Sequence, residues 1–314
     1  MRYVARAAYE FWVVTRLIVP QSGFSALRFL LSSFVKRAYL FLKKGDILMS
    51  DTDVLTTKND TEKEVANDLY QALVYKRPLK VTEYEKKVTD FDTAYRVQHA
   101  FTELKKEPLG GYKVSLTSEQ TQRMFNSDSP FYGAETASAW LENDASLQLS
   151  DLMDPLLEVE MVFTAKENLL PSDSLAELLD KVSVSAGVEL PDSRFKDWFP
   201  SLPKYLVVAD GAVGGRVVYT KATGSEVSVD DLANVACTLT LNGKELGSGK
   251  SSEVLGNPLN SLQWLVKKLS EQGVAYPKGT KVSSGTFLLP PHLEKGHYVA
   301  HFDKYFDDVR LDVQ

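Results

Sequence analysis

The chain has few of the side chains that build the most common metal and redox sites. Its 314 residues include one cysteine, Cys237, and four histidines. A single cysteine excludes an internal disulfide and a CxxC motif. No histidine has the HExxH or HxH spacing, so a zinc site made of nitrogen and sulfur ligands is not expected. Any metal bound here must be held by oxygen atoms.

The sequence also lacks a long hydrophobic run and an excess of positive charge. The longest uncharged stretch among the first 48 residues, residues 17–27, contains Pro20 and Gly23. No stretch reaches the roughly 20 apolar residues that cross a bilayer. The net charge of −6 argues against sequence-independent nucleic-acid binding, which needs a basic surface. We therefore predict no membrane span and no nucleic-acid partner.

Residues 1–48 differ in charge from the rest of the chain. They carry eight Lys and Arg against Glu10 and Asp46. One interpretation is a basic amphipathic element on an anionic membrane surface. The other is an extension that precedes a functional chain starting at Met49. Together with the polar leader that follows, residues 1–58 are expected to stand outside the fold.

Residues 59–109 are predicted to form a small helical part. Thr61 and Glu64 have the spacing of a capping box, and apolar residues then recur at helical period. Pro78 ends this helix, and a second helix is expected to start at Asp92.

From residue 110 the pattern changes to short β-like runs. Asn242-Gly243 is a strong hairpin signal, and one helix is marked by Asn257 before it and Gly273 after it. The clearest strand runs are residues 156–164, 182–189, 216–219, 237–241, 281–289 and 298–313. Strands and helices do not alternate regularly, so a doubly wound parallel sheet is not expected. The predicted fold class is mixed α/β, rich in mostly antiparallel strands, with residues 110–314 as the main domain.

Two glutamates in one apolar strand are the most informative chemical feature. Alternate side chains of a strand share a face, so Glu158 and Glu160 point the same way. Two adjacent carboxylates repel each other and are costly to bury, and a hard divalent cation relieves both problems. The alternative is a solvated outer face of an edge strand.

Two further residues are candidates for chemistry. Glu189 ends another strand run, although an ordinary polar turn explains it equally well. Lys113 follows a double glycine and lies between apolar residues. If it is buried, we expect it to exchange protons near neutral pH; a surface lysine with a buried stem is the alternative.

Seven segments together match one known pattern in order and spacing. They are GYKVSLT (111–117), DSPFYG (128–133), LEVE (157–160), VELPDSR (188–194), ADGA (209–212), NG (242–243) and GNPLNSLQWL (256–265). This series resembles the 2-hydroxypenta-2,4-dienoate hydratase (2-keto-4-pentenoate hydratase) and 4-oxalocrotonate decarboxylase group. That group belongs to the fumarylacetoacetate hydrolase superfamily, and the resemblance implies its mixed β-roll fold.

The resemblance also implies a site. Glu158, Glu160 and Glu189 would bind Mg²⁺ or Mn²⁺, and Lys113 would lie beside the substrate as an acid, a base or a carboxylate contact. Substrate contacts would come from two short segments: Leu116, Thr117, Ser284 and Gly285.

The implied activity is hydration of a 2-hydroxy-2,4-dienoate of the vinylpyruvate type to a 4-hydroxy-2-oxo acid. Alternatives are decarboxylation of a 2-oxo-hexenedioate or C–C hydrolysis of an acylpyruvate on the same metal site, or a degenerate binding protein. The resemblance further implies a cytoplasmic homo-oligomer that acts on a small molecule.

The chain departs from the pattern at two positions. Hydratases of this group often carry an aspartate where this sequence has Phe131, and a glycine where it has Ser115. The missing carboxylate bears on the proton transfers of hydration, whereas the three predicted metal ligands are all present.

Overall fold

The computed structural model describes residues 54–303 and 305–314, within one compact unit, Thr52–Gln314. Most of the predicted extension, residues 1–53, lies outside the described residues. Leu55 belongs to the same predicted extension but is described, and its side chain is buried in the main core. No helix in the described ranges is long and apolar enough to cross a bilayer.

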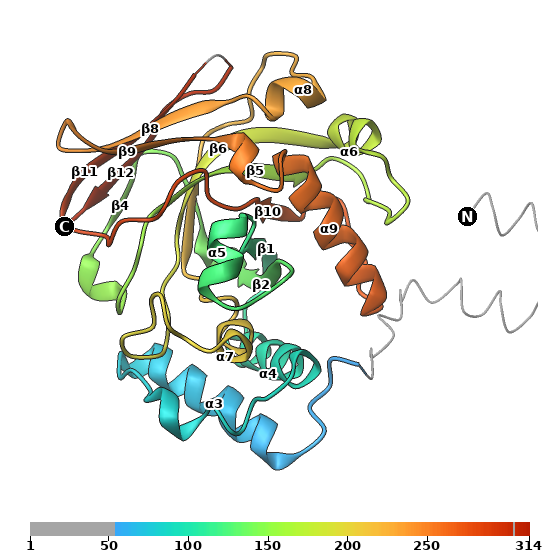
Figure 1. Ribbon diagram of the computed structural model, residues 1–314, viewed down its shortest axis with the longest axis vertical. Helices are drawn as coiled ribbons and strands as arrows, with labels where there is room; N and C mark the ends of the chain where they lie inside the picture. Colours follow the sequence, from blue (N-terminus) through green and yellow to red (C-terminus); the bar gives the residue numbers. More distant parts are fainter. Residues whose placement is uncertain (1–53, 304) are drawn as a thin grey trace, which may run out of the picture. The chain divides into compact units, whose positions relative to one another are not determined.

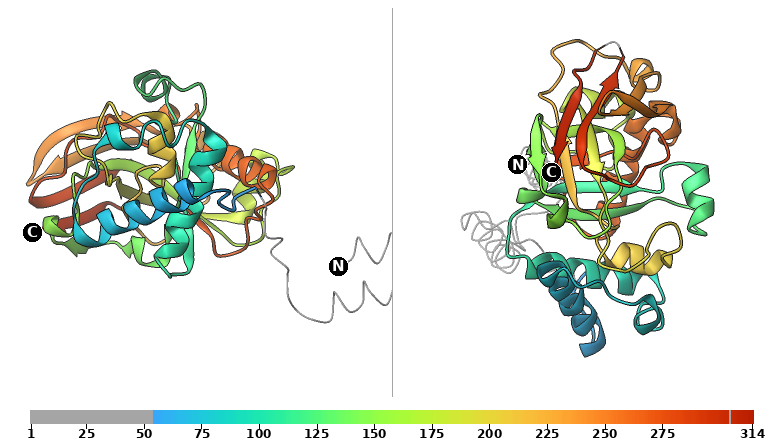
Figure 2. Two further views of the ribbon diagram at one scale, coloured as in Figure 1. Left: turned by 90° about the horizontal axis from the view of Figure 1, so that it is seen from below. Right: turned by 90° about the vertical axis from the view of Figure 1, so that its left-hand side faces the viewer.

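Two helices of the N-terminal part pack against each other at one end of the unit (Figures 1 and 2). Helix α3 spans Asp60–Tyr75 and α4 spans Phe91–Leu104. A buried ion pair of 2.8 Å between Glu62 and Arg96 joins them. The capping box predicted at Thr61 was wrong, because Asn59 is the N-cap and accepts from the Glu62 amide.

The larger sheet has seven strands in the order β2-β1-β10-β5-β6-β7-β3. Their bounds are β1 Leu109–Ser115, β2 Phe131–Thr136, β3 Trp140–Glu142, β5 Glu158–Ala165, β6 Val182–Leu190, β7 Arg216–Tyr219 and β10 Lys281–Ser283. Most neighbours are antiparallel; β1–β10 and β3–β7 are parallel. The mixed, mostly antiparallel fold class is thus confirmed.

This sheet curls into a roll. Only the short helix Ala137–Ala139 separates edge strand β2 from edge strand β3, so the two edges lie close together. Trp140 on β3 reaches across the roll, and a Cβ added to Gly111 on β1 would lie 2.6 Å from its ring. The interior holds a small apolar cluster that includes Trp140 and Val162. Because Val162 shares a strand face with Glu160, the glutamates also face the interior.

The outer face of the roll packs on the main core. Val159, Met161 and Phe163 of β5, and Leu157 directly before it, are all fully buried there. A second sheet has the order β4-β12-β11-β8-β9. Its strands are β4 Ala145–Leu147, β8 Ala236–Leu241, β9 Lys244–Lys250, β11 Gly296–Phe302 and β12 Val309–Val313.

The hairpin and one helix follow their sequence signals. Asn242 and Gly243 join β8 to β9 with φ of 50° and 79°, as their residue types predict. Helix α9, Pro258–Glu271, begins after the predicted N-cap Asn257. Four shorter helices were not predicted: α5 Glu119–Met124, α6 Leu175–Lys181, α7 Lys204–Ala209 and α8 Val229–Leu232. A signal was available for α6, because Ser174 and Glu177 have the spacing of a capping box.

Two predicted strand runs need correction. The run 281–289 is a strand only as far as Ser283, because the chain then turns through Gly285 with φ of 112°. The run 298–313 is not continuous and contains parts of two antiparallel strands, β11 and β12.

Candidate metal centre

Three carboxylates meet inside the roll. Glu158 and Glu160 lie on β5, and Glu189 on β6 is the direct cross-strand partner of Glu158. One oxygen from each of the three lies within 4.8 Å of the others. Glu160 and Glu189 are fully buried, and Glu158 is partly exposed. The pair on β5 therefore does not lie on a solvated outer face.

A lysine lies against this cluster. Lys113 on β1 is 1% exposed, and its Nζ is 2.9 Å from Oε1 of Glu189. The same ammonium donates to Oγ of Ser115 at 2.5 Å and to the carbonyl of Ala212 at 3.0 Å. Two hydrogen bonds and one ion pair thus hold the charged nitrogen of Lys113 in place.

Glu160 is oriented by strand β10 and the turn that follows it. Its Oε2 accepts from Oγ of Ser283 at 2.6 Å and from the amide of Gly285 at 2.8 Å. The positive φ of Gly285 directs that amide at the carboxylate. These bonds leave Oε1 of Glu160 free to face its neighbours.

Burial and mutual repulsion shift the pKa values of the cluster. Burial and, to a smaller extent, the charge of Glu158 together raise the pKa of Glu160 to about 8, against the hydrogen bond from Ser283, which lowers it. Burial likewise raises the pKa of Glu158, and that of Glu189 lies well above its ordinary value. Without a cation, this site therefore retains protons that ordinary glutamates lose.

The pKa of Lys113 moves in the opposite direction to the one predicted from burial. Burial disfavours the ammonium, but the charges of Glu189, Glu158 and Glu160 outweigh it and raise the pKa of Lys113. The direction of this shift is opposite to the one on which the predicted proton exchange of Lys113 near neutral pH depends, and its role stays a prediction. Its neighbours keep it charged.

Two buried carboxylate oxygens without hydrogen-bond partners indicate whether the site suits a cation. Oε1 of Glu160 and Oε2 of Glu189 are inaccessible and have no hydrogen-bond partner in the described part of the chain. A buried carboxylate oxygen without a partner is costly. Three oxygen donors of this kind suit Mg²⁺ or Mn²⁺, which prefer hard ligands. The residues present therefore fit a divalent cation.

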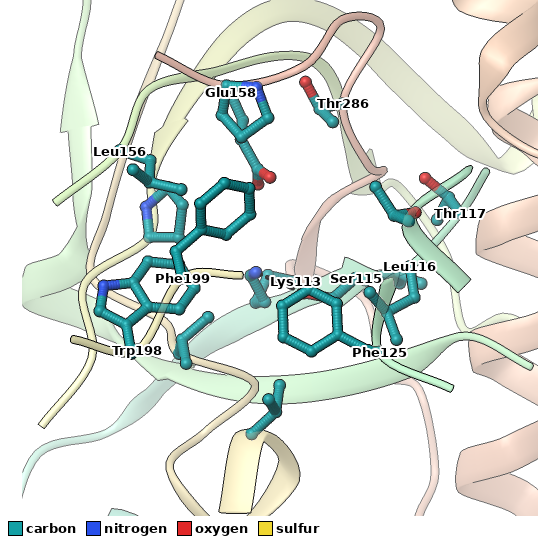
Figure 3. A pocket seen from close by; sticks show the side chains of 16 residues that line it. Lys113, Ser115, Leu116, Thr117, Phe125, Leu156, Glu158, Trp198, Phe199 and Thr286 are labelled. Carbon is teal, nitrogen blue, oxygen red and sulfur yellow. Dashed lines mark hydrogen bonds between the residues drawn. The ribbon is translucent and has the colours of Figure 1, made fainter. Parts of the chain in front are cut away.

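A pocket opens beside Lys113 and Glu158 (Figure 3). Its walls are mostly apolar and come from separate segments of the chain, among them Phe125, Leu156, Trp198 and Phe199. These wall residues were not predicted from the sequence. The aromatic pair Trp198-Phe199, close behind the predicted ligand Glu189, was the available signal.

The predicted substrate-contact residues divide into two groups. Leu116 and Thr117 line the pocket. Gly285 touches Thr117 and donates to Glu160, but it is not part of the wall. Ser284 is fully buried, and its hydroxyl accepts from the Met161 amide outside the pocket. The serine that faces the carboxylates is its neighbour Ser283, which the sequence analysis did not select.

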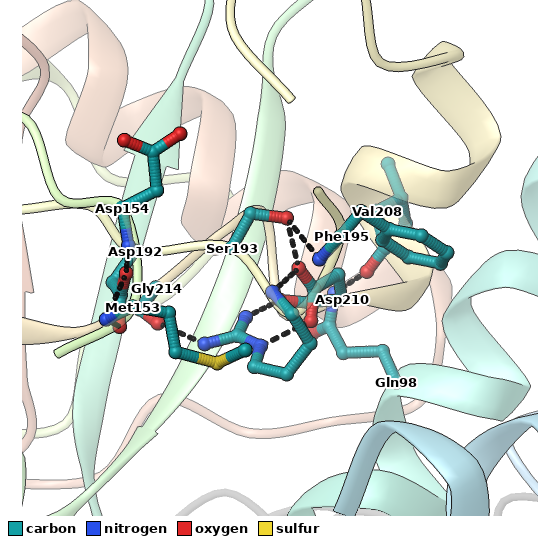
Figure 4. A network of polar contacts seen from close by, with 10 residues as sticks. Gln98, Met153, Asp154, Asp192, Ser193, Phe195, Val208, Asp210 and Gly214 are labelled. Carbon is teal, nitrogen blue, oxygen red and sulfur yellow. Dashed lines mark hydrogen bonds and ion pairs between the residues drawn. The ribbon is translucent and has the colours of Figure 1, made fainter. Parts of the chain in front are cut away.

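A buried polar network supports the loop that contacts Lys113 (Figure 4). Asp210 forms an ion pair with Arg194 and accepts from Oγ of Ser193 at 2.8 Å. Arg194 also donates to the carbonyl of Gly214 at 2.8 Å. Because Ala212 lies between Asp210 and Gly214, the network fixes the carbonyl that Lys113 contacts. It ties the chain after β6 to the loop after α7.

Another carboxylate in this region supports the entry to β5. Asp192 accepts from the backbone amides of Met153 at 3.0 Å and Asp154 at 2.8 Å. These contacts hold the chain that leads into Glu158 and Glu160. We therefore assign Asp192 a supporting contact and no direct chemistry.

Phe131 and Asp128 do not face the pocket. Phe131 is 1% exposed, and its ring centroid lies 5.3 Å from that of Phe91. Asp128 is exposed and does not line the pocket. The close sequence position of Asp128 therefore does not replace the aspartate that the pattern has at position 131.

A solved structure shares this fold. 4-Oxalocrotonate decarboxylase from Pseudomonas putida G7, complexed with magnesium and adipate, aligns with a TM-score of 0.74 at 23% identity. The alignment covers 82% of this chain and 100% of the decarboxylase. No protein-family model matches the sequence.

Curated relatives define the family. The 2-keto-4-pentenoate hydratase of Burkholderia vietnamiensis is 31% identical over 224 residues, 68% of this chain and 83% of the relative. The 2-hydroxyhexa-2,4-dienoate hydratase of Comamonas testosteroni is 31% identical over 252 residues, 77% of this chain and 91% of the relative. The chain belongs to the 2-keto-4-pentenoate hydratase family, as the seven segments predict.

Proposed function

We propose that the protein is a divalent-metal-dependent hydro-lyase that converts a 2-hydroxy-2,4-dienoate into a 4-hydroxy-2-oxo acid. The observation that carries the proposal is the buried cluster of Glu158, Glu160 and Glu189 beside a charged lysine. The curated hydratases among the relatives, which include the two that are 31% identical, support it.

The three glutamates would hold Mg²⁺ or Mn²⁺ at the inner end of the pocket. When bound, the cation would supply positive charge and Lewis-acid character next to the substrate oxygens. Related decarboxylase structures contain magnesium or calcium, which supports a divalent cation in general.

Lys113 and the pocket walls supply the rest of the site. The Lys113 ammonium is fixed between Glu189 and the pocket, where it can bind a substrate oxygen or hold a proton at Nζ. Phe125, Trp198 and Phe199 form apolar surface that excludes bulk water from the bound dienoate. Leu116 and Thr117 would contact the substrate from the side of β1.

The charge of the pocket favours hydration over decarboxylation. A 2-oxo-hexenedioate carries a second carboxylate at its far end, and burying it without a cation is costly. Lys113 is the only positively charged residue among those described as lining the pocket, and it lies next to the glutamates. The remaining walls suit an uncharged far end.

The proposal extends to the setting of the enzyme. Since the curated relatives are bacterial hydratases and decarboxylases, we infer a cytoplasmic enzyme that acts on a small 2-oxo or 2-hydroxy enoate. A homo-oligomer is proposed on the basis of the family resemblance alone.

The test is a spectrophotometric assay of the purified chain with 2-hydroxypenta-2,4-dienoate. We expect the dienoate absorbance to fall only when Mg²⁺ or Mn²⁺ is present, to stop after chelation, and to yield a 4-hydroxy-2-oxo acid. The matched controls are 2-oxohex-3-enedioate, with CO₂ as the readout, and an acylpyruvate, with acid release as the readout. Faster turnover of either control, or hydration unaffected by chelation, would contradict the proposal.

A further inference from the structure

The two positions at which the chain departs from the family pattern lie next to each other. Ser115 on β1 is the cross-strand partner of Phe131 on β2. Directly opposed side chains share a face of an antiparallel pair and are close enough to act together. The sequence thus has an apolar and a hydroxyl side chain where the pattern has an aspartate and a glycine.

The two side chains have different environments. Phe131 is buried in an aromatic cluster, where Phe91 contacts both it and Tyr205, with ring centroids 5.3 Å and 5.0 Å apart. Ser115 is partly exposed and lines the pocket beside Lys113 (Figure 3). The polar group of this strand pair therefore lies on β1.

The hydroxyl of Ser115 has a defined donor, and its own hydrogen is only weakly bonded. An ammonium can only donate, so Oγ of Ser115 accepts from Lys113 at 2.5 Å. The nearest acceptor for the hydroxyl hydrogen is the carbonyl of Ala212, at 3.5 Å from Oγ. A contact of that length is weak, so the hydrogen remains available to an oxygen atom in the pocket.

Ser115 also completes the set of acceptors around Lys113. The other two are Oε1 of Glu189 and the carbonyl of Ala212. Both lie on the buried side of the ammonium, whereas Ser115 lies in the pocket wall. Without its hydroxyl, one N–H donor loses its protein partner and Nζ is less well held.

We propose that Ser115 is a positioning residue that fixes the Lys113 ammonium at the edge of the pocket. Its catalytic consequence rests on the proposed hydratase function. The hydroxyl keeps Nζ between the glutamates and the substrate, in a strand pair whose other member is apolar.

Kinetics of two substitutions test the role. Losing one hydrogen bond to a charged group should lower kcat of Ser115→Ala about tenfold or more, with KM changed less than about twofold. Ser115→Thr keeps the hydroxyl and should retain most of kcat. Ser183→Ala replaces a partly buried serine on a different strand, β6; it is the control and should match the unmodified enzyme. Equal losses in the Ala and Thr variants, or a change in KM alone, would overturn the proposal.

A second measurement does not depend on activity. The full-length chain is labelled with ¹⁵N-lysine, and the Lys113 Nζ signal is assigned by its loss in Lys113→Met. We expect its hydrogen exchange to be faster in Ser115→Ala than in the unmodified chain and Ser115→Thr. Identical exchange in all three would overturn the positioning role. If hydrogen exchange at Lys113 Nζ depends on the Ser115 hydroxyl but the protein has no hydratase activity, the positioning role of Ser115 is kept. The proposed hydratase function is then rejected.

Discussion

Glu160 is the residue on which the proposed metal site depends most. It is fully buried, has one oxygen bonded to Ser283 and Gly285, and has its other oxygen without a partner. Its carboxylate is therefore already oriented before any cation arrives. Preorganised ligands of this kind raise affinity because little ordering remains to be done on binding.

Replacing this carboxylate with an amide separates metal binding from folding. Glu160→Gln keeps the shape and can still accept from Ser283 and Gly285, but it removes one anionic ligand. We expect Mn²⁺ affinity measured by calorimetry to fall at least about a hundredfold, since a hard cation needs hard anionic ligands. The thermal midpoint without metal should not fall, because a repulsive neighbour of Glu158 is gone. Glu177→Gln, on a fully exposed carboxylate, is the control. Unchanged Mn²⁺ affinity in Glu160→Gln would reject the site.

For single residues, the sequence predicts which face of a strand a side chain occupies better than it predicts the charges around that side chain. Strand alternation alone placed Glu158 and Glu160 on one face, as the structure has them. The pKa of Lys113 could not be predicted, because it depends on how many carboxylates surround the lysine. Those carboxylates come from strands that are distant in sequence.

The loop between α7 and β7 is the element that links the core to the site. Arg194 and Asp210 are both buried, and their ion pair holds the carbonyl of Ala212 against Lys113. Removing one charge leaves the other buried without a partner, which is expensive.

We therefore expect Asp210→Asn to reduce the free energy of unfolding by about 3 kcal/mol, measured by urea titration. Its kcat should fall as well, because the loop no longer fixes Ala212. The matched control is Asp197→Asn, whose exposed ion pair with Lys196 spans 3.8 Å and should matter by less than about 0.5 kcal/mol. Equal stability of the two variants would contradict this account.

Elements with strong local signals were predictable, and those set by tertiary contacts were not. Asn257, Pro258 and Gly273 mark α9 in the sequence, and the structure confirms that helix. The segment after Ser283 is as apolar as a strand, yet it leaves the sheet because the Gly285 amide bonds to Glu160. The aromatic wall of the pocket likewise combines residues whose proximity no local pattern reveals.

For the whole molecule, the glutamate cluster links stability to pH. The folded pKa of Glu160 is about 8, above its ordinary value of 4.5, so between these values the folded state binds more protons than the unfolded state. Stability from this group is thus fully present below about pH 4.5 and is lost as pH rises through about 8.

Thermal midpoints measured without metal should therefore fall as pH rises from about 5 to 8, and less steeply in Glu160→Gln. Added Mg²⁺ should raise the midpoint more at pH 8 than at pH 6, because cations and protons compete for the same oxygens. A Mg²⁺ effect that is larger at pH 6 would contradict the linkage. Identical slopes for the unmodified chain and the variant would show that Glu160 is not the responsible group.

The position of β10 has a consequence for biosynthesis. This strand lies between β1 and β5, and it comes from residues 281–283, near the end of the chain. A polypeptide still emerging from the ribosome has β1, β5 and β6 long before the strand that joins β1 to β5. The carboxylate cluster and its lysine are brought together only after Ser283 and Gly285 have been translated. Uptake of the proposed cation would therefore follow the synthesis of this later segment and could not begin when the three glutamates alone have been made.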